Sequence, residues 1–167
     1  TDAVMLSEET TLGAYPVKAV EVMSRIARHT EEKLDYEEIL KHNHLLPKSI
    51  SDSISFAIVN AAHNIGAKGI VALTETGFTA RVISRYRPKQ SVLALTPNVK
   101  TFNQLAVSFG CYPRLVKKFN NVSEVIEMAK KMSIKHKIVK KGDKIVIAAG
   151  IPFGKSGATN LLIVQVV

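Results

Sequence analysis

The clearest helical pattern in the chain lies between residues 51 and 65. Apolar side chains recur there three or four residues apart, which places them on one face of a helix. They are Ile54, Ala57, Ile58, Ala61, Ala62 and Ile65. Ser51 has a side chain that can cap the first turn, and Gly66 is suited to end the last one. The pattern predicts a helix with these two residues at its ends.

Beyond this helix, short runs of Val, Ile, Leu and Ala alternate with helical patterns. The runs predict strands over 69–73, 91–95, 112–116, 144–149 and 161–167, and helices over 79–86, 99–108 and 122–132. Each of the first three strand-to-strand connections contains a helix, which favours parallel strands joined by right-handed crossovers. The last connection contains none, so the final strand should be antiparallel. The expected fold class is α/β, a three-layer sandwich with a mostly parallel five-stranded sheet.

The first 50 residues follow a different pattern. Residues 3–6 (AVML) are a candidate for a short buried strand, and residues 7–15 for a loop. Pro16 suits the first turn of a helix, and an apolar stripe continues to Ala27. One strand and one helix cannot close a sheet alone. Residues 34–50 are interpreted as a polar connector with a possible short helix that ends at Pro47.

The chain is basic, with 23 Lys and Arg against 14 Asp and Glu and a formal charge of +9. Such an excess favours anionic partners, including phosphates, nucleic acids and acidic surfaces. The densest lysine stretch, residues 130–141, lies at the end of a predicted helix, where solvated lysines complement the helix dipole. No nucleic-acid-binding motif is present and the lysines are scattered, so nucleic acid is not an expected partner.

The single cysteine, Cys111, excludes an internal disulfide framework and fits a reducing cytoplasm. It is expected to be a buried structural thiol, because no His or acidic residue beside it would activate it. No apolar run approaches the roughly 20 residues that a membrane span requires, so no membrane partner is expected. The chain starts without Met and enters an apolar run at once, which suggests a segment cut from something longer.

Two loops at predicted strand ends have residues that suit a phosphate. Residues 74–79 (TETGFT) run from a strand into a helix N-terminus, where backbone N–H groups are unpaired. Residues 150–160 combine three glycines with Lys155 and hydroxyl side chains. If the first and fourth strands are neighbours, the two loops should face one another at the carboxyl edge of the sheet. Glu75 opposes this interpretation through its charge, and ordinary turn chemistry is the alternative for both loops.

Other chemistry finds little support. The GKSG sequence at 154–157 lacks the spacing of a phosphate-binding P-loop and precedes a strand instead of a helix. The histidines show no metal-ligand spacing, and no metal site is expected. They are His29, His42, His44, His63 and His136. No nucleophile–base constellation or carboxylate pair emerges, and no catalytic residue is assigned within the chain.

Three segments carry a resemblance to pyruvate kinases. TDAVMLSEETTLGAYP (1–16) resembles the family's DAVMLSGETAxGxYP stretch, although Glu8 stands where the family usually has glycine. TETGFTARVISRYRP (74–88) and GDKIVIAAGIPFGKSGATN (142–160) resemble two segments of the family's C-terminal domain. The resemblance covers nearly the whole chain and is weakest over residues 34–50.

The resemblance implies three parts. Residues 1–34 would be the last strand and helix of a truncated catalytic (β/α)8 TIM barrel, 35–50 a connector, and 51–167 the C-terminal regulatory α/β domain. The family transfers a phosphoryl group from phosphoenolpyruvate to ADP, giving pyruvate and ATP, with Mg2+ and K+ as cofactors. Most of those binding residues belong to earlier barrel strands, so this chain should be inactive. Ser7, Glu9 and Thr10 would lie near the active-site mouth of the full-length parent.

The resemblance also implies an allosteric site for a phosphorylated metabolite, either a sugar phosphate or AMP. Its phosphate loop would comprise Thr74, Glu75, Thr76, Gly77, Phe78 and Thr79, and its opposing loop Lys155, Ser156, Gly157, Ala158 and Thr159. Glu75 replaces a lysine found in some family members, which favours an effector with one phosphate. The family forms homotetramers partly through this domain. The alternative hypothesis is an assembly domain with vestigial effector loops, and the apolar final strand supports it.

Overall fold

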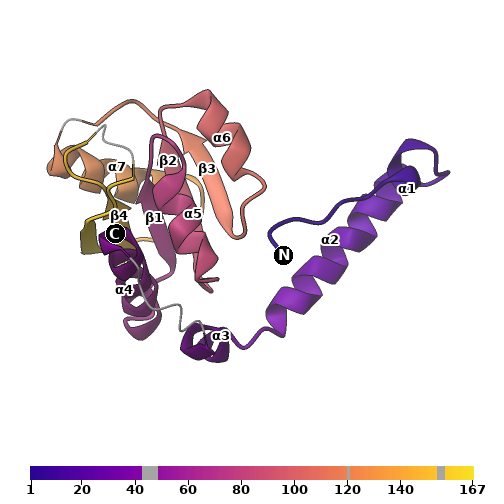
Figure 1. Cartoon of the computed structure of the whole chain (residues 1–167), viewed down its shortest axis with the longest axis horizontal. Helices are drawn as coiled ribbons and strands as arrows, with labels where there is room; N and C mark the ends of the chain where they lie inside the picture. Colours follow the sequence, from indigo (N-terminus) through magenta and orange to yellow (C-terminus); the bar gives the residue numbers. More distant parts are fainter. Residues whose placement is uncertain (43–48, 120, 154–156) are drawn as a thin grey trace.

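The sheet at the centre of the protein has five strands in the order β3-β2-β1-β4-β5 (Figure 1). The structure is a computed structural model, and it describes residues 1–42, 49–119, 121–153 and 157–167. The strands are β1 (Gly69–Leu73), β2 (Ser91–Thr96), β3 (Cys111–Leu115), β4 (Lys144–Ala149) and β5 (Leu161–Val166). The first four are parallel, and β5 pairs antiparallel with β4. The predicted mixed sheet is therefore confirmed.

Helices cover both faces of the sheet, as the three-layer prediction requires. One face packs against α4 (Ile50–Asn64), α5 (Phe78–Arg85) and α6 (Val99–Leu105), and the other against α7 (Val122–Lys135). Side chains of β1 alternate between the two cores. Ile70 and Ala72 belong to the first cluster, and Val71 and Leu73 to the second. Because both faces are buried, the strand is apolar at every position.

The helix boundaries correct one prediction. The cap of α4 is Ser49, whose side chain accepts a hydrogen bond from the Asp52 backbone N–H, so the helix begins two residues earlier than predicted. Ser51 lies inside the first turn and is buried. Gly66 follows the end of this helix as predicted. The N-terminal boundary was misjudged because two serines of equal capping ability stand two residues apart.

The N-terminal segment contains three helices: α1 (Glu8–Thr11), α2 (Pro16–Glu32) and α3 (Tyr36–His42). The strand predicted over residues 3–6 is wrong, because no described strand lies beside it to complete a hydrogen-bond ladder. Pro16 starts α2 as predicted, but no residue of this helix is buried, and α2 projects away from the sheet (Figure 1). The short helix expected within 34–50 is α3, whereas Pro47 lies outside the described residues.

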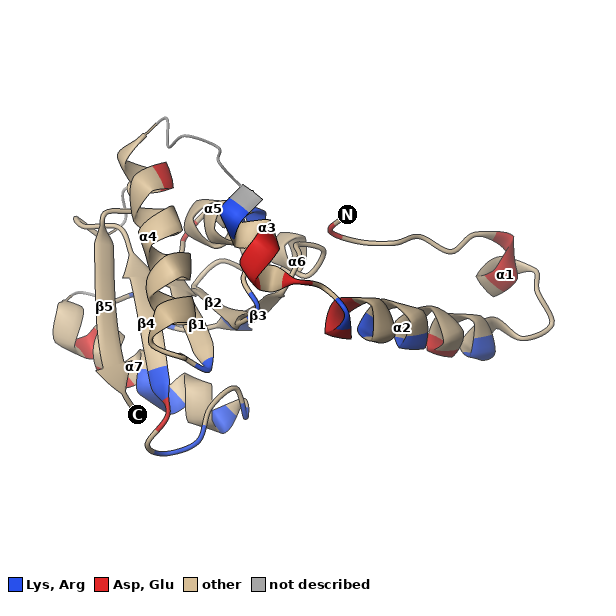
Figure 2. Cartoon of the chain, turned by 90° about the horizontal axis from the view of Figure 1, so that it is seen from below, with Lys and Arg blue, Asp and Glu red and all other residues tan. Residues whose placement is uncertain are grey.

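Acidic residues are in excess in the N-terminal segment, and basic residues are in excess in the rest of the chain. Residues 1–42 contain nine Asp and Glu against five Lys and Arg, whereas residues 43–167 contain five against 18. Figure 2 shows part of this excess where β4 begins and α7 ends. Lys68 and Lys144 are neighbours there, since the Lys68 backbone N–H donates to the Lys144 carbonyl over 2.9 Å. The positive field that attracts anions therefore belongs to the part of the chain that forms the sheet.

Cys111 is buried at the start of β3, where its thiol faces the Ala80 carbonyl at 3.9 Å. Burial raises the pKa of this thiol to about 11. At pH 8 the thiolate fraction should be about 100-fold smaller than in the unfolded chain, as follows from a pKa difference of about two units. We expect the folded protein to react with a thiol reagent at least that much more slowly than the urea-unfolded protein. Equal rates would show that the thiol is accessible.

Candidate functional site

The two phosphate-suited loops meet because β1 and β4 are adjacent. Their register runs from Gly69 opposite Ile145 to Ala72 opposite Ala148, so both strands end at the same edge of the sheet. A pocket lies between the loops. Its lining combines Leu73, Thr74, Glu75, Thr76, Phe78, Thr79, Pro97, Lys118, Phe119, Ala149, Gly150, Phe153, Gly157 and Ala158.

The first loop is held by hydrogen bonds to its backbone. The Thr74 N–H donates to the Leu95 carbonyl over 3.0 Å, and the Thr101 hydroxyl donates to the Glu75 carbonyl over 2.7 Å. Gly77 caps α5 with φ of 84°, in the left-handed region that favours glycine. This turn places the first residues of α5 at the pocket, where their N–H groups have no acceptor within the helix.

The two ends of the second loop are joined by hydrogen bonds between Ile151 and Asn160. The Asn160 side chain accepts a hydrogen bond from the Ile151 N–H at 2.8 Å and donates to the Ile151 carbonyl at 2.7 Å. Gly150 lies so close to the returning chain that a Cβ added there would be 1.9 Å from the Ala158 carbonyl oxygen. The loop therefore requires glycine at this position. Lys155 and Ser156, which the sequence assigned to the site, lie outside the described residues.

A chain of hydroxyl groups joins the two loops to α4. The Thr79 and Thr159 hydroxyls lie 2.8 Å apart. The Thr159 N–H donates to the Ser51 hydroxyl over 3.1 Å, and that hydroxyl donates to the Gly157 carbonyl over 3.0 Å. Thr159 was expected to contact the effector, but it is fully buried behind the pocket lining. It fastens the second loop to the first.

The carboxylate of Glu75, which was expected to repel a phosphate, has a positively charged neighbour in the pocket lining. The carboxylate lies 4.0 Å from the Lys118 ammonium group, so the charge that was expected to repel a phosphate is offset within the lining. Among the described residues, none forms a hydrogen bond with the hydroxyl of Thr74, although this residue is only 8% exposed. Because Thr74 lines the pocket, its hydroxyl is available to a ligand.

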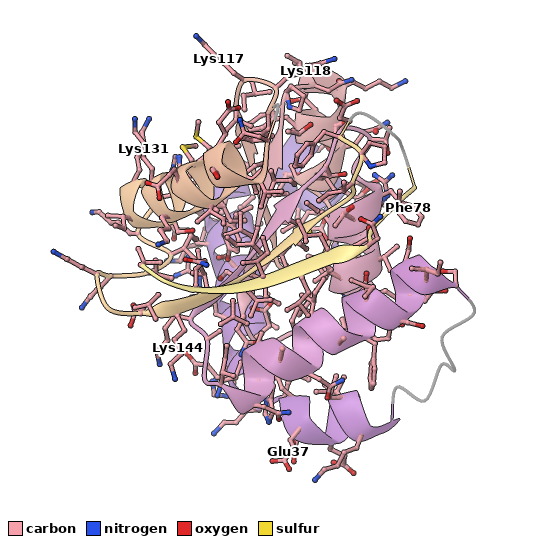
Figure 3. The ribbon with its side chains drawn as sticks, turned by 90° about the vertical axis from the view of Figure 1, so that its left-hand side faces the viewer. Glu37, Phe78, Lys117, Lys118, Lys131 and Lys144 are labelled. Carbon is pink, nitrogen blue, oxygen red and sulfur yellow. The ribbon has the colours of Figure 1, made fainter. Side chains whose placement is uncertain are left out.

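The sequence analysis missed several lining residues. Lys118 and Phe119 follow β3, and Pro97 follows β2. Because β1 to β4 are parallel, all of these connections leave the sheet at the same edge. The parallel pattern was recognised in the sequence, so this rule could have placed Lys118 near the loops. In Figure 3, Lys118 lies at the top and Phe78 at the right, and both lie away from Lys144 at the lower left.

The residues expected near the active-site mouth of the parent are not part of this pocket. Ser7, Glu9 and Thr10 lie at α1, beyond the far end of α2 (Figure 1). The Ser7 N–H donates to the Glu9 carboxylate at 2.8 Å, and the Thr10 hydroxyl donates to the Ser7 carbonyl at 3.0 Å. Hydrogen bonds from the backbone N–H groups of Glu9 and Ser7 lower the pKa of Glu9. These contacts are local and assemble no ligand site with the two loops.

Neither a metal-ion cluster nor a membrane-spanning helix is found among the described residues. No group of three or more His, Cys, Asp or Glu side chains there is arranged to hold a metal ion. Within the same residues, no helix combines the length and apolar character needed to cross a membrane.

The comparisons with known proteins decide the family. The family model described as "Pyruvate kinase, alpha/beta domain" matches residues 52–165. The chain belongs to the pyruvate kinase family. The pyruvate kinase of Clostridium acetobutylicum is 42% identical over 170 residues, which cover 100% of this chain and 36% of that protein. The pyruvate kinase of Lactobacillus delbrueckii subsp. bulgaricus is 39% identical over 170 residues, covering 100% of this chain and 29% of that protein.

Solved structures of pyruvate kinases also match this chain. A crystal structure of a pyruvate kinase from Cryptosporidium parvum matches with a TM-score of 0.91 and 31% identity, over 99% of this chain and 33% of that one. The chain therefore spans about a third of the length of the pyruvate kinases it matches. The resemblance stated from the three sequence segments is confirmed.

Three serines on α4 test the fastening of the second loop. Ser51 forms hydrogen bonds with that loop, Ser53 is exposed, and the Ser55 hydroxyl is buried without a partner. We expect Ser51→Ala to lower the free energy of unfolding by about 1–3 kcal/mol, because it leaves the Gly157 and Thr159 backbone groups unpaired. Ser53→Ala, the matched control, should change it by less than about 0.5 kcal/mol. Ser55→Ala should be neutral or stabilising.

Urea unfolding of the three variants measures these differences. Equal effects of Ser51→Ala and Ser53→Ala would contradict the assigned role of Ser51.

Proposed function

We propose that this chain is the regulatory part of a pyruvate kinase and that its pocket binds a phosphorylated metabolite, either a sugar phosphate or AMP. The parent enzyme would transfer a phosphoryl group from phosphoenolpyruvate to ADP, giving pyruvate and ATP, with Mg2+ and K+. The chain alone is expected to be inactive, since the pyruvate kinases it matches are about three times as long. Effector binding would then be its contribution to the whole enzyme.

The observation that carries this proposal is the convergence of three phosphate-suited groups on one pocket. The first turn of α5 contributes N–H groups and the positive end of the helix dipole. Thr74 contributes a hydroxyl group at the pocket wall, and Lys118 contributes a flexible positive charge. The groups come from two different connections of the sheet, so local turn chemistry alone does not account for their meeting.

Calorimetry of the chain tests the proposal. Fructose 1,6-bisphosphate, ribose 5-phosphate, glucose 6-phosphate and AMP would be titrated separately up to millimolar concentration. At least one should bind with one site per chain, and inorganic phosphate should compete with it. The absence of binding by all four compounds would defeat the proposal.

Two variants locate the binding site. Lys118→Ala should lower the affinity for the bound compound by about 3- to 10-fold, because it removes one charge-assisted contact. Lys117→Ala is the matched control, since this neighbouring lysine is exposed and does not line the pocket. Thr74→Val should weaken binding without lowering the free energy of unfolding, because the hydroxyl has no partner among the residues that the structure describes. Equal loss for both lysine variants would indicate general charge attraction and not this pocket.

A second candidate function is assembly with further copies of the chain, as in a homo-oligomer of the parent. Its support is β5, which is an edge strand with Val164 43% and Val166 57% exposed. Unpaired apolar edges favour association. Sedimentation should show a dimer or larger species that Val166→Lys shifts towards the monomer. A strict monomer at high concentration would remove assembly as a function of this chain.

A further inference from the structure

The strand β3 lies at one edge of the sheet and is packed differently on its two faces. On one face, Cys111 is buried in the hydrophobic cluster that α4, α5 and α6 cover. On the other face, Tyr112 and Arg114 lie beside Leu93 and Leu95 of β2, which are buried in the cluster around α7. No described residue of β3 belongs to that second cluster, and Tyr112 is 46% exposed. Hydrophobic packing against α7 therefore comes from the strands beside β3 and not from β3 itself.

A side-chain hydrogen bond connects β3 to the end of α7 instead. The Arg114 Nε–H donates to Nδ1 of His136 over 3.0 Å. A second N–H of the same guanidinium donates to the Pro113 carbonyl over 2.7 Å, which orients the group. His136 directly follows α7, and its backbone N–H donates to the Met132 carbonyl over 3.0 Å. The acceptor is therefore held in place by the last turn of the helix.

This hydrogen bond exists in one protonation state of the imidazole. A guanidinium group is always charged and can only donate, so Nδ1 of His136 must be unprotonated to accept from it. A proton on Nδ1 would replace the acceptor with a donor and would place two positive charges next to each other. Protonation of the ring therefore breaks the connection between β3 and α7.

The surroundings of the ring favour its neutral form. Partial burial is the main cause that lowers the pKa of His136 below its ordinary value of about 6.5. The positive charges of Arg114 on β3 and Lys135 on α7 lower this pKa further. These are the charged groups that act on the ring among the described residues, and within the same residues His136 forms no ion pair with a carboxylate. An imidazolium at this position would have cationic neighbours and no anionic one.

We propose that Arg114 and His136 form an acid-sensitive latch, which joins β3 to the end of α7 while the imidazole is neutral and opens when the imidazole is protonated. The latch acts on a strand that the α7 cluster does not hold, so its opening loosens the sheet edge and leaves both hydrophobic cores intact. This inference does not depend on which ligand the pocket binds.

Urea unfolding between about pH 8 and pH 5 tests the latch. Because the pKa of His136 is lower in the folded chain, the latch stabilises the fold fully above about pH 6.5, and this contribution is lost as the pH falls through the folded-state pKa. Over that interval the folding equilibrium constant should decrease by up to about 10-fold per pH unit more than in His136→Gln, whose side chain accepts a hydrogen bond but does not titrate.

His29→Gln is the matched control, because His29 is exposed on α2. This variant should keep the pH dependence of the unaltered chain. Each protein is compared with itself across the pH range, so a difference in stability at pH 8 does not affect the result. The same pH dependence in His136→Gln and the unaltered chain would overturn the inference.

NMR of the imidazole gives a measurement that a purely structural role of His136 would not move. Two-bond proton–nitrogen correlations at about pH 8 should show Nδ1 without a proton and Nε2 with one. In Arg114→Met the titration midpoint of His136 should move to higher pH, because the ring loses its donor and a cationic neighbour. Lys100→Met, which removes an exposed charge on α6, should leave that midpoint unchanged. A proton on Nδ1 at pH 8, or the same midpoint in Arg114→Met and the unaltered chain, would overturn the latch.

Discussion

The parallel pairing of β1 with β4 is the constraint on which the rest of the site depends. It places two connections that are more than 70 residues apart in sequence at the same edge of the sheet. The register is fixed by the cores on both faces. A slip of one residue would turn Ile70 and Ala72 towards α7, and Val71 and Leu73 towards α4 and α5, which would disrupt both clusters. Core packing therefore determines where the pocket forms.

The fold could be predicted because its signals are local and repeated. β4 has the predicted bounds, and α5 begins one residue before its prediction, since apolar runs and helical spacing recur in every unit. The errors occurred where the outcome depends on partners distant in sequence. Residues 3–6 have a strand-like composition, but a strand needs a neighbour. Ser51 resembles a helix cap, but its hydroxyl bonds instead to a loop more than 100 residues away.

The sequence was sufficient to find the two loops of the candidate site, but not all of the residues that line the pocket. Glycine and threonine at the strand ends identified both loops, because these residues permit tight turns and backbone access. Lys118 and Phe119 carry no comparable local signal, since a lysine beside a phenylalanine after a strand is ordinary. Their importance follows from the parallel sheet, which brings the connection after β3 to the same edge. The charge of Glu75 was considered from the sequence, but Lys118, whose ammonium group lies 4.0 Å from it, was not.

The position of α5 relates the pocket to the N-terminal segment. Its first turn lines the pocket, and its last turn ends at Arg85, whose guanidinium lies 2.6 Å from the Asp52 carboxylate of α4. Two residues later, Arg87 lies 2.5 Å from the carboxylate of Asp2, over the ring of Phe109. Ion pairs this exposed contribute little to stability, so the Arg87–Asp2 contact can break while both hydrophobic clusters stay intact. The helix α5 thus begins at the pocket and ends two residues before the side chain that contacts Asp2.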